Sequence, residues 1–361
     1  MAGWLAALWL VVAPLGVEAT DVQRPVTGLA DDVQVSEVAL DALVTDRRGN
    51  VVVGLDKDDF EVFEDGDPVE LTGVTFYSNR ELLESSEQAK RLGVDPDEVP
   101  SERYFVLFFH DQRQQLARLA GQQMDAGRWA ERWVRSDLLP NDYVAVVSYD
   151  YTLRVHQDFT NDHAAAAREI KNAVISRGGG GSQEAQGNGP SLVTNLPAGE
   201  ALQQATGEIY DALEVLAQAL DEIPGRKNLA LFSIGFGDSG PFGFYTPDTR
   251  RYPQLLYDLN NANVAVYAVD LIPTSAPGGL RGRVLNNSLS YLATETGGEY
   301  FYNFVNFRTP LENMAEETSG YYLLTYRSAH PAGEEGYQEV TVQTVDRSLD
   351  VRTRSGYLWG E

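Results

Sequence analysis

Residues 104–115 read YFVLFFHDQRQQ, an apolar run that turns abruptly polar at His110. A run this short and this rich in aromatic residues is typical of a strand that is buried on both faces in a parallel sheet. The polar residues then lie at the carboxyl edge of the strand, where ligands bind in open α/β sheets. The stretch therefore predicts a binding edge, and it leaves open whether Asp111 contacts a metal, a substrate, a partner or its own loop.

Three further apolar runs have the same character: YVAVVSY (143–149), NLALFSIG (228–235) and NVAVYAVD (263–270). Helical stretches separate them, and the clearest has apolar residues spaced three and four apart from Leu202 to Ile223. Buried strands that alternate with such helices predict an α/β domain, in which helices cover a mostly parallel sheet on both faces.

The two ends of the chain have a β pattern instead. Apolar residues occupy mostly alternate positions from Val33 to Val44, and Asp65-Gly66 is a hairpin signal between two short strand patterns. The pattern returns in YYLLTY (321–326) and VRTRSGYLW (351–359). Each end has too few strands to bury an apolar face alone, so we predict that the two ends pack together.

This gives a division of the chain into segments. Residues 33–78 and 320–358 are predicted to build one small β-sandwich-like module, and residues 102–319 the α/β domain. Residues 79–101 are rich in Glu, Ser, Asp and Pro without strong periodicity, which indicates a linker.

Composition excludes several classes of protein. The 361 residues include 28 Lys and Arg against 53 Asp and Glu, a net charge of -25, so the surface repels the phosphates of nucleic acids. The absence of cysteine rules out disulfides, thiolate zinc sites and a cysteine nucleophile. The four histidines include no pair at i, i+4 spacing on one helix, which argues against a zinc enzyme.

The N-terminus predicts export. An apolar run from Trp4 to Leu15 precedes Val17-Glu18-Ala19, a small-x-small pattern that signal peptidase reads. We expect residues 1–19 to be a signal peptide, the mature chain to begin at Thr20, and the protein to be periplasmic or secreted without a membrane span. The alternative is an uncleaved anchor, although the run is shorter than the ~20 residues that span a bilayer.

Six stretches spread along the chain are similar to one known family. They occur in the family's order over about residues 33–358, and jointly they are specific although each alone is weak. The stretches are ALVTDRRGNVVVGLDKDDFEVFEDG (42–66), YVAVVSYDYTLRVHQDFT (143–160), LNNANVAVYAVDL (259–271), LATETGGEYF (292–301), SGYYLLTYRS (319–328) and VRTRSGYL (351–358). On these stretches the chain resembles the von Willebrand factor type A-related proteins of acidobacterial type.

The resemblance implies a von Willebrand type A (VWA) domain, a Rossmann-like sheet flanked by helices, at about residues 102–319, with β segments at both ends. Such domains generally act in adhesion or protein binding, often through a metal-ion-dependent adhesion site at the carboxyl edge of the sheet. No catalytic activity comes with the family. The resemblance therefore implies a protein partner and no enzyme.

The residues of this chain depart from the family's metal site. Asp111 matches the first Asp of the Asp-x-Ser-x-Ser motif, but Arg113 and Gln115 stand in place of the two serines. Ile234, after Ser233, stands in place of the late Asp. Mg²⁺ requires oxygen ligands, so we expect a degenerate site without a metal cofactor. The candidate partner-binding residues are Asp111, Arg113, Gln115, Thr194 (a possible match for the family's Thr), Ser233 and Asp238.

Two interpretations of Asp111 and Arg113 remain open. Arg113 either takes over the role of the cation and binds a partner carboxylate, or it forms an internal ion pair with Asp111 that closes the loop. His110 could suggest acid–base chemistry, but no serine nucleophile or third group can be placed beside it, so we expect no catalytic residues.

Three classes of function follow. The first is an exported, non-enzymatic interaction or adhesion module. The second is a structural component of a cell-envelope assembly, which an occluded carboxyl edge would favour. The third is an enzyme, which would require an ordered nucleophile and base in one cleft.

Overall fold

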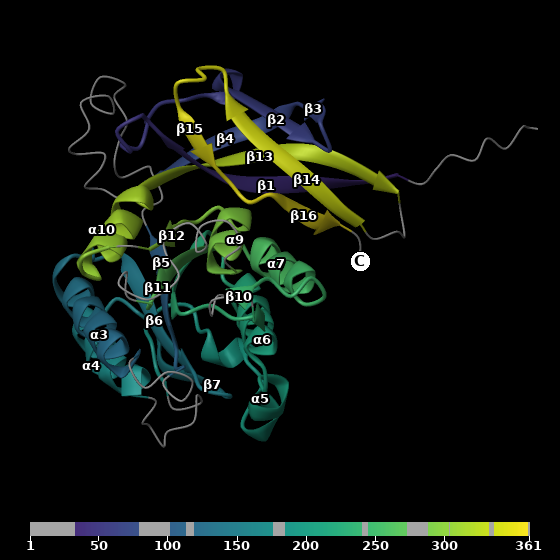
Figure 1. Cartoon of the computed structure of the whole chain (residues 1–361). Helices are drawn as coiled ribbons and strands as arrows, with labels where there is room; N and C mark the ends of the chain where they lie inside the picture. The colour runs from purple at the N-terminus through teal and green to yellow at the C-terminus, as the bar shows by residue number, and fades with distance from the viewer. Residues whose placement is uncertain are drawn as a thin grey trace, which may run out of the picture.

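The structure is a computed structural model, and it describes residues 33–78, 102–112, 119–175, 185–239, 245–272, 288–302, 304–331 and 336–359. The predicted signal peptide, the predicted linker, Arg113 and Gln115 lie outside these residues. Figure 1 shows two parts, an α/β domain below and a pair of β-sheets above it.

A six-stranded sheet forms the centre of the α/β domain, in the order β12-β11-β8-β5-β6-β7. Neighbouring strands are parallel except for β7, which is antiparallel to β6. This confirms the predicted mostly parallel sheet and adds an antiparallel edge. The strands are β5 (Arg103–His110), β6 (Asp142–Tyr149), β7 (Leu153–Thr160), β8 (Lys227–Ser233), β11 (Val264–Asp270) and β12 (Tyr300–Phe301).

Helices cover both faces of this sheet. Every residue of β5 is buried, and its side chains alternate between two apolar clusters: Phe108 lies in one and Phe109 in the other. The first cluster packs against α5 (Glu200–Ala205), α6 (Ile209–Asp221), α7 (Tyr252–Asn261) and α9 (Ser288–Glu295). The second packs against α3 (Leu119–Ser136), α4 (His163–Ile175) and α10 (Arg308–Glu317).

The sequence predicts one helix from Leu202 to Ile223, and this prediction is wrong because the structure has two helices there. The predicted helix is split into α5 and α6 by residues 206–208, where the Thr206 hydroxyl donates a 2.7 Å hydrogen bond back to the carbonyl of Leu202. Gly207 follows, and glycine weakens a helix interior. The apolar period continues across the break, so periodicity alone does not reveal it.

Two four-stranded sheets combine the N-terminal and C-terminal segments, in the orders β15-β1-β13-β4 and β16-β14-β2-β3. Their strands are β1 (Val33–Thr45), β2 (Phe60–Glu64, preceded by the 3₁₀ helix η1, Lys57–Asp59), β3 (Asp67–Val69), β4 (Leu71–Ser78), β13 (Gly320–Pro331), β14 (Gly336–Thr344), β15 (Asp350–Arg352) and β16 (Gly356–Trp359).

Each of these sheets depends on both ends of the chain. β1 pairs antiparallel with β13 from Val33↔Pro331 to Ala42↔Tyr322, and β2 pairs with β14. Both sheets contribute to a third apolar cluster, which includes Leu40, Val62 and Tyr322. Asp65 and Gly66 have φ values of 46° and 91°, as a type I′ hairpin requires, so this turn is confirmed.

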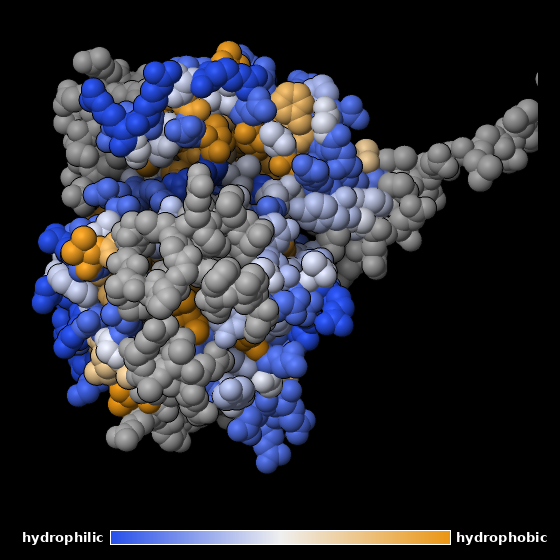
Figure 2. Space-filling view, in the orientation of Figure 1, coloured by the Kyte–Doolittle hydropathy of each residue, from blue (hydrophilic) through white to orange (hydrophobic). Residues whose placement is uncertain are grey.

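Arginine side chains connect the β-sheets to the α/β domain. Arg354 donates to the carbonyls of Asn260 and Ala39, the latter at 2.6 Å. Arg352 pairs with Glu317 at 2.7 Å and Glu299 at 3.2 Å. Hydrophilic side chains cover most of the described surface in the view of Figure 2, consistent with the acidic composition. Among the described helices, none has the length and apolar character needed to cross a membrane.

Candidate functional site

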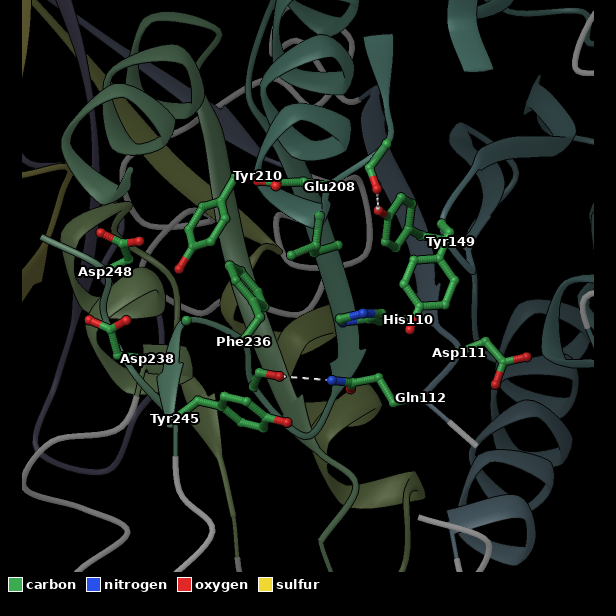
Figure 3. Close-up of a pocket in the computed structure, with 15 residues that line it drawn as sticks. His110, Asp111, Gln112, Tyr149, Glu208, Tyr210, Phe236, Asp238, Tyr245 and Asp248 are labelled. Carbon is green, nitrogen blue, oxygen red and sulfur yellow. Dashed lines mark hydrogen bonds between the residues drawn. The ribbon is translucent and has the colours of Figure 1, made fainter. Parts of the chain in front are cut away.

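A cavity of about 330 Å³ opens at the carboxyl edge of the central sheet. We call it the edge pocket (Figure 3). Five separate segments line it: the end of β5, the end of β6, the break before α6, the loop after β8, and the segment that contains β10 (Tyr245–Thr246). The lining residues are His110, Asp111, Gln112, Tyr149, Tyr151, Gly207, Glu208, Ile209, Tyr210, Gly235, Phe236, Gly237, Asp238, Tyr245 and Asp248.

A hydrogen-bond network ties the ends of β5 and β8 together beneath this pocket. The Ser233 hydroxyl lies 3.0 Å from Nδ1 of His110 and donates to Oε1 of Gln112 at 3.1 Å. Oε1 of Gln112 also accepts from the backbone N–H of Ile234 at 2.9 Å, and its Nε2 donates to the Gly235 carbonyl at 2.9 Å, drawn dashed in Figure 3. All these groups are buried, and each polar atom named has a partner.

The network carries no net charge. Burial lowers the pKa of His110 to about 3, so the imidazole is neutral near pH 7. Because the Ser233 hydroxyl proton is donated to Gln112, the geometry assigns the Nδ1 proton to His110, which donates to the Ser233 oxygen. The strand ends are thus held by neutral groups.

The pKa of His110 leads to a pH prediction. The unfolded chain protonates this histidine near pH 6.5, whereas the folded chain resists protonation down to about pH 3. Stability should therefore fall as the pH drops below 6.5, by about 1.4 kcal/mol per pH unit at most from this residue. His110→Asn keeps a donor near Nδ1 and cannot titrate, so urea unfolding from pH 7 to pH 4 should show a shallower decline for the variant. Equal slopes would contradict the assignment.

The predicted site residues fall into three groups. Asp111 and Asp238 line the edge pocket, and Figure 3 shows the Asp111 carboxylate on the opposite side from Asp238. Ser233 has no exposed surface, which corrects the expectation that its side chain belongs to a partner-binding face. Thr194 is exposed in the 3₁₀ helix η3 (Val193–Asn195), where its hydroxyl donates to the Ser191 carbonyl at 3.2 Å, and it does not line the pocket.

Two of the described positions, Ser233 and Ile234, do not offer the oxygen ligands of the implied magnesium site. Ile234 is 5% exposed and packs in an apolar cluster, and the Ser233 hydroxyl is already engaged with His110 and Gln112. Across the described ranges, no group of three or more His, Asp or Glu side chains has the arrangement of a metal site. The described residues at these positions do not converge as a set of oxygen ligands.

Several lining residues were not predicted from the sequence. Gln112 lies in the stretch 104–115, but it can link the network only because β8 lies beside β5. Glu208 lies in the helix break and Tyr210 in the first turn of α6, and Gly207 within an apolar helical pattern could have indicated the break. Asp248 lies in a turn before α7 without a sequence signal of its own.

Gly237 lets two segments approach at the pocket. Its φ is +119°, and a Cβ atom there would lie 2.2 Å from the Thr246 carbonyl oxygen and 2.9 Å from the Tyr210 hydroxyl. Only glycine fits between them. This close approach allows β9 (Asp238–Ser239) to pair with β10 and places Asp238 and Tyr245 at the pocket.

Comparisons with known proteins find no matching family model and no matching curated protein. Solved structures that are similar include proximal thread matrix protein 1 of the mussel byssus (13% identity, 60% of this chain and 48% of that chain, TM-score 0.37). A second is BatB from Bacteroides thetaiotaomicron (13% identity, 60% of this chain and 97% of that chain, TM-score 0.37). A third is a von Willebrand factor type A protein from Catenulispora acidiphila (10% identity, 72% of this chain and 67% of that chain, TM-score 0.36). The chain spans about half the length of the mussel protein.

Proposed function

We propose that this chain is an exported, non-enzymatic binding protein that presents the edge pocket to a protein partner without a bound metal. The observation that carries the proposal is the pocket itself, an open cavity at the sheet edge that five segments build above a closed, neutral network. Rigid strand ends hold its floor in place, which suits recognition.

Two features support a binding role rather than catalysis. The hydroxyl nearest to His110 belongs to Ser233, which is completely buried and therefore out of reach of a substrate. The Ser233 proton is donated to Gln112 and not to the imidazole, so His110 does not act as a base toward it.

A variant that fills part of the pocket without changing its charge tests this proposal. A Cβ atom at Gly207 would meet no atom within 4 Å, so Gly207→Phe should fold and fill part of the pocket without changing charge. Gly121→Phe on the exposed start of α3 is the matched control, since a Cβ atom there also meets nothing within 4 Å. Both variants and the wild type serve as bait for native envelope extract, in millimolar Mg²⁺ and in chelator.

The expected result is a partner band that the wild type and Gly121→Phe capture equally and that Gly207→Phe captures at least about tenfold less, a loss of roughly 1.4 kcal/mol. Capture should be the same with Mg²⁺ and with chelator. Capture that depends on Mg²⁺ would contradict a metal-free site. Equal capture by all three baits would favour the structural-scaffold alternative, in which the carboxyl edge is not used.

Export rests on the apolar run and the Val17-Glu18-Ala19 pattern. N-terminal sequencing of the protein from its native host should give Thr20 as the first residue. Recovery of Met1 in a membrane fraction would show an anchored protein instead.

A further inference from the structure

We infer that the edge pocket binds a cationic side chain, lysine or arginine, of the protein partner. The inference rests on the proposed function and names the chemistry of the ligand.

The charge of the lining is the first argument. Four carboxylates line the pocket, from Asp111, Glu208, Asp238 and Asp248, and the described lining residues include no lysine or arginine. The neutral His110 adds no positive charge. A pocket lined by one sign of charge concentrates ligands of the opposite sign, and the net charge of -25 on the whole chain acts in the same direction.

The described arginines near Glu208 and Asp248 do not neutralise these two carboxylates. Arg251 approaches Glu208 at 3.2 Å and Glu214 at 3.7 Å and also pairs with Asp211, so one guanidinium is shared by three carboxylates. Arg250 lies 3.5 Å from Asp248, but its side chain is 86% exposed, and such a pair is weak. Negative charge from Glu208, Asp238 and Asp248 therefore remains for a ligand.

The aromatic residues are the second argument. Tyr210, Phe236 and Tyr245 stand beside the carboxylates in Figure 3. Aromatic faces attract ammonium and guanidinium groups, and Tyr210 already holds the Arg251 guanidinium 5.3 Å from its ring centre. An apolar stem with a charged head matches this combination of rings and acids.

The Tyr210 hydroxyl is the third argument, and it is independent of the carboxylates. Tyr210 is 6% exposed, its hydroxyl proton has no acceptor, and the donor that faces its oxygen is the backbone N–H of Asp248. Figure 3 shows this hydroxyl pointing toward Asp238 and Asp248. A buried phenol oxygen can accept a second hydrogen bond. An N–H donor from a ligand between these groups would supply that second hydrogen bond.

The arrangement favours an organic cation over a metal ion. The Asp111 carboxylate lies on the opposite side of the pocket from Asp238 and Asp248, so the acids surround a volume and do not converge on one point. A cavity of about 330 Å³ is also far larger than a metal ion and suits one long side chain.

The test uses the full chain and four probes: the Nα-acetyl amides of lysine, arginine, norleucine and glutamate, titrated by NMR to roughly 50 mM, where binding weaker than millimolar is still visible. The lysine and arginine probes should give saturable shifts, and the neutral and acidic probes should give none. Because exposed charges are screened by salt, raising the NaCl concentration should weaken the binding.

Three variants locate the site. Asp238→Asn with Asp248→Asn should weaken binding of the lysine probe by at least about tenfold, since each lost charge pair contributes modestly. Asp67→Asn with Glu70→Gln removes the same number of charges from exposed positions on and beside β3 and should leave binding unchanged. Tyr210→Phe removes only the hydroxyl, and a several-fold loss is expected.

Two outcomes would overturn the inference. One is the absence of saturable binding by the lysine and arginine probes, or equal binding of the norleucine probe. The other is binding of the glutamate probe that Arg113→Ala abolishes, which would show recognition of a carboxylate instead. In either case a loss of partner capture by Gly207→Phe would leave the proposed function standing, because that block does not depend on charge.

Discussion

A chain that ends at Ser319 is expected to lose the structure of residues 33–78 and to bind a hydrophobic dye. The truncation removes β13, which supplies the pairing partner of β1 and β4, and β14, which pairs with β2. Among the described N-terminal strands, only the short β2–β3 pairing would then remain, and a lone hairpin is at best marginally stable. Buried residues of β1 such as Leu40 and Val44 would become exposed.

Dye fluorescence and thermal unfolding measure this effect. The control is a chain of residues 102–319, which lacks both β segments and should bind less dye than the chain that ends at Ser319. We propose that the two segments form one sandwich-like folding unit. A truncated chain that melts like the full mature chain would refute that proposal.

Replacement of Arg103 by Met should destabilise the α/β domain by about 3–5 kcal/mol, because it leaves a buried carboxylate without its cation. Nε and Nη2 of Arg103 bind the two carboxylate oxygens of Asp142 at 2.7 and 2.6 Å, and the side chains are 6% and 0% exposed. Arg103 also donates to the Ala315 carbonyl at 2.9 Å, which links β5 to α10. Urea unfolding measures the loss.

Two further variants separate the buried charge from the lost contacts. In the double variant Arg103→Met with Asp142→Asn, the amide oxygen can still accept from the Leu139 N–H, as the carboxylate does at 2.7 Å, so much of the stability should return. Arg135→Met removes an exposed pair with Glu131, whose side chains are 41% and 42% exposed, and should cost about 0–1 kcal/mol. If Arg103→Met also costs only about 0–1 kcal/mol, the buried pair with Asp142 is not needed for the stability of the domain.

The pattern of residues in the sequence was sufficient to predict the buried central strands and the Asp65-Gly66 turn. Continuous apolar runs such as 104–110 predict strands that are buried on both faces, because each residue of such a strand must pack against one helical layer or the other. Asp65-Gly66 predicts a type I′ turn because both positions adopt positive φ with little strain. These properties depend on neighbouring residues, so a sequence reports them directly.

The pairing of the chain ends could also be argued from the sequence, since strands with one apolar face need partners. The register of that pairing could not. The helix predicted from Leu202 to Ile223 shows a related limit: its apolar period continues through residues 206–208, although the backbone leaves the helix there.

The sequence by itself determined the buried character of the central strands, the acidic composition of the protein and the location of a polar strand end at Asp111. Only the tertiary structure decided what surrounds that end. β8 lies beside β5, so Ser233 reaches His110 across 123 residues of chain and is buried by that contact. The helix break and the Gly237 turn then bring Tyr210 and Asp238 to the same cavity. Hydrophobic periodicity is a local property, whereas a pocket depends on the order of strands in the sheet, which no single segment encodes.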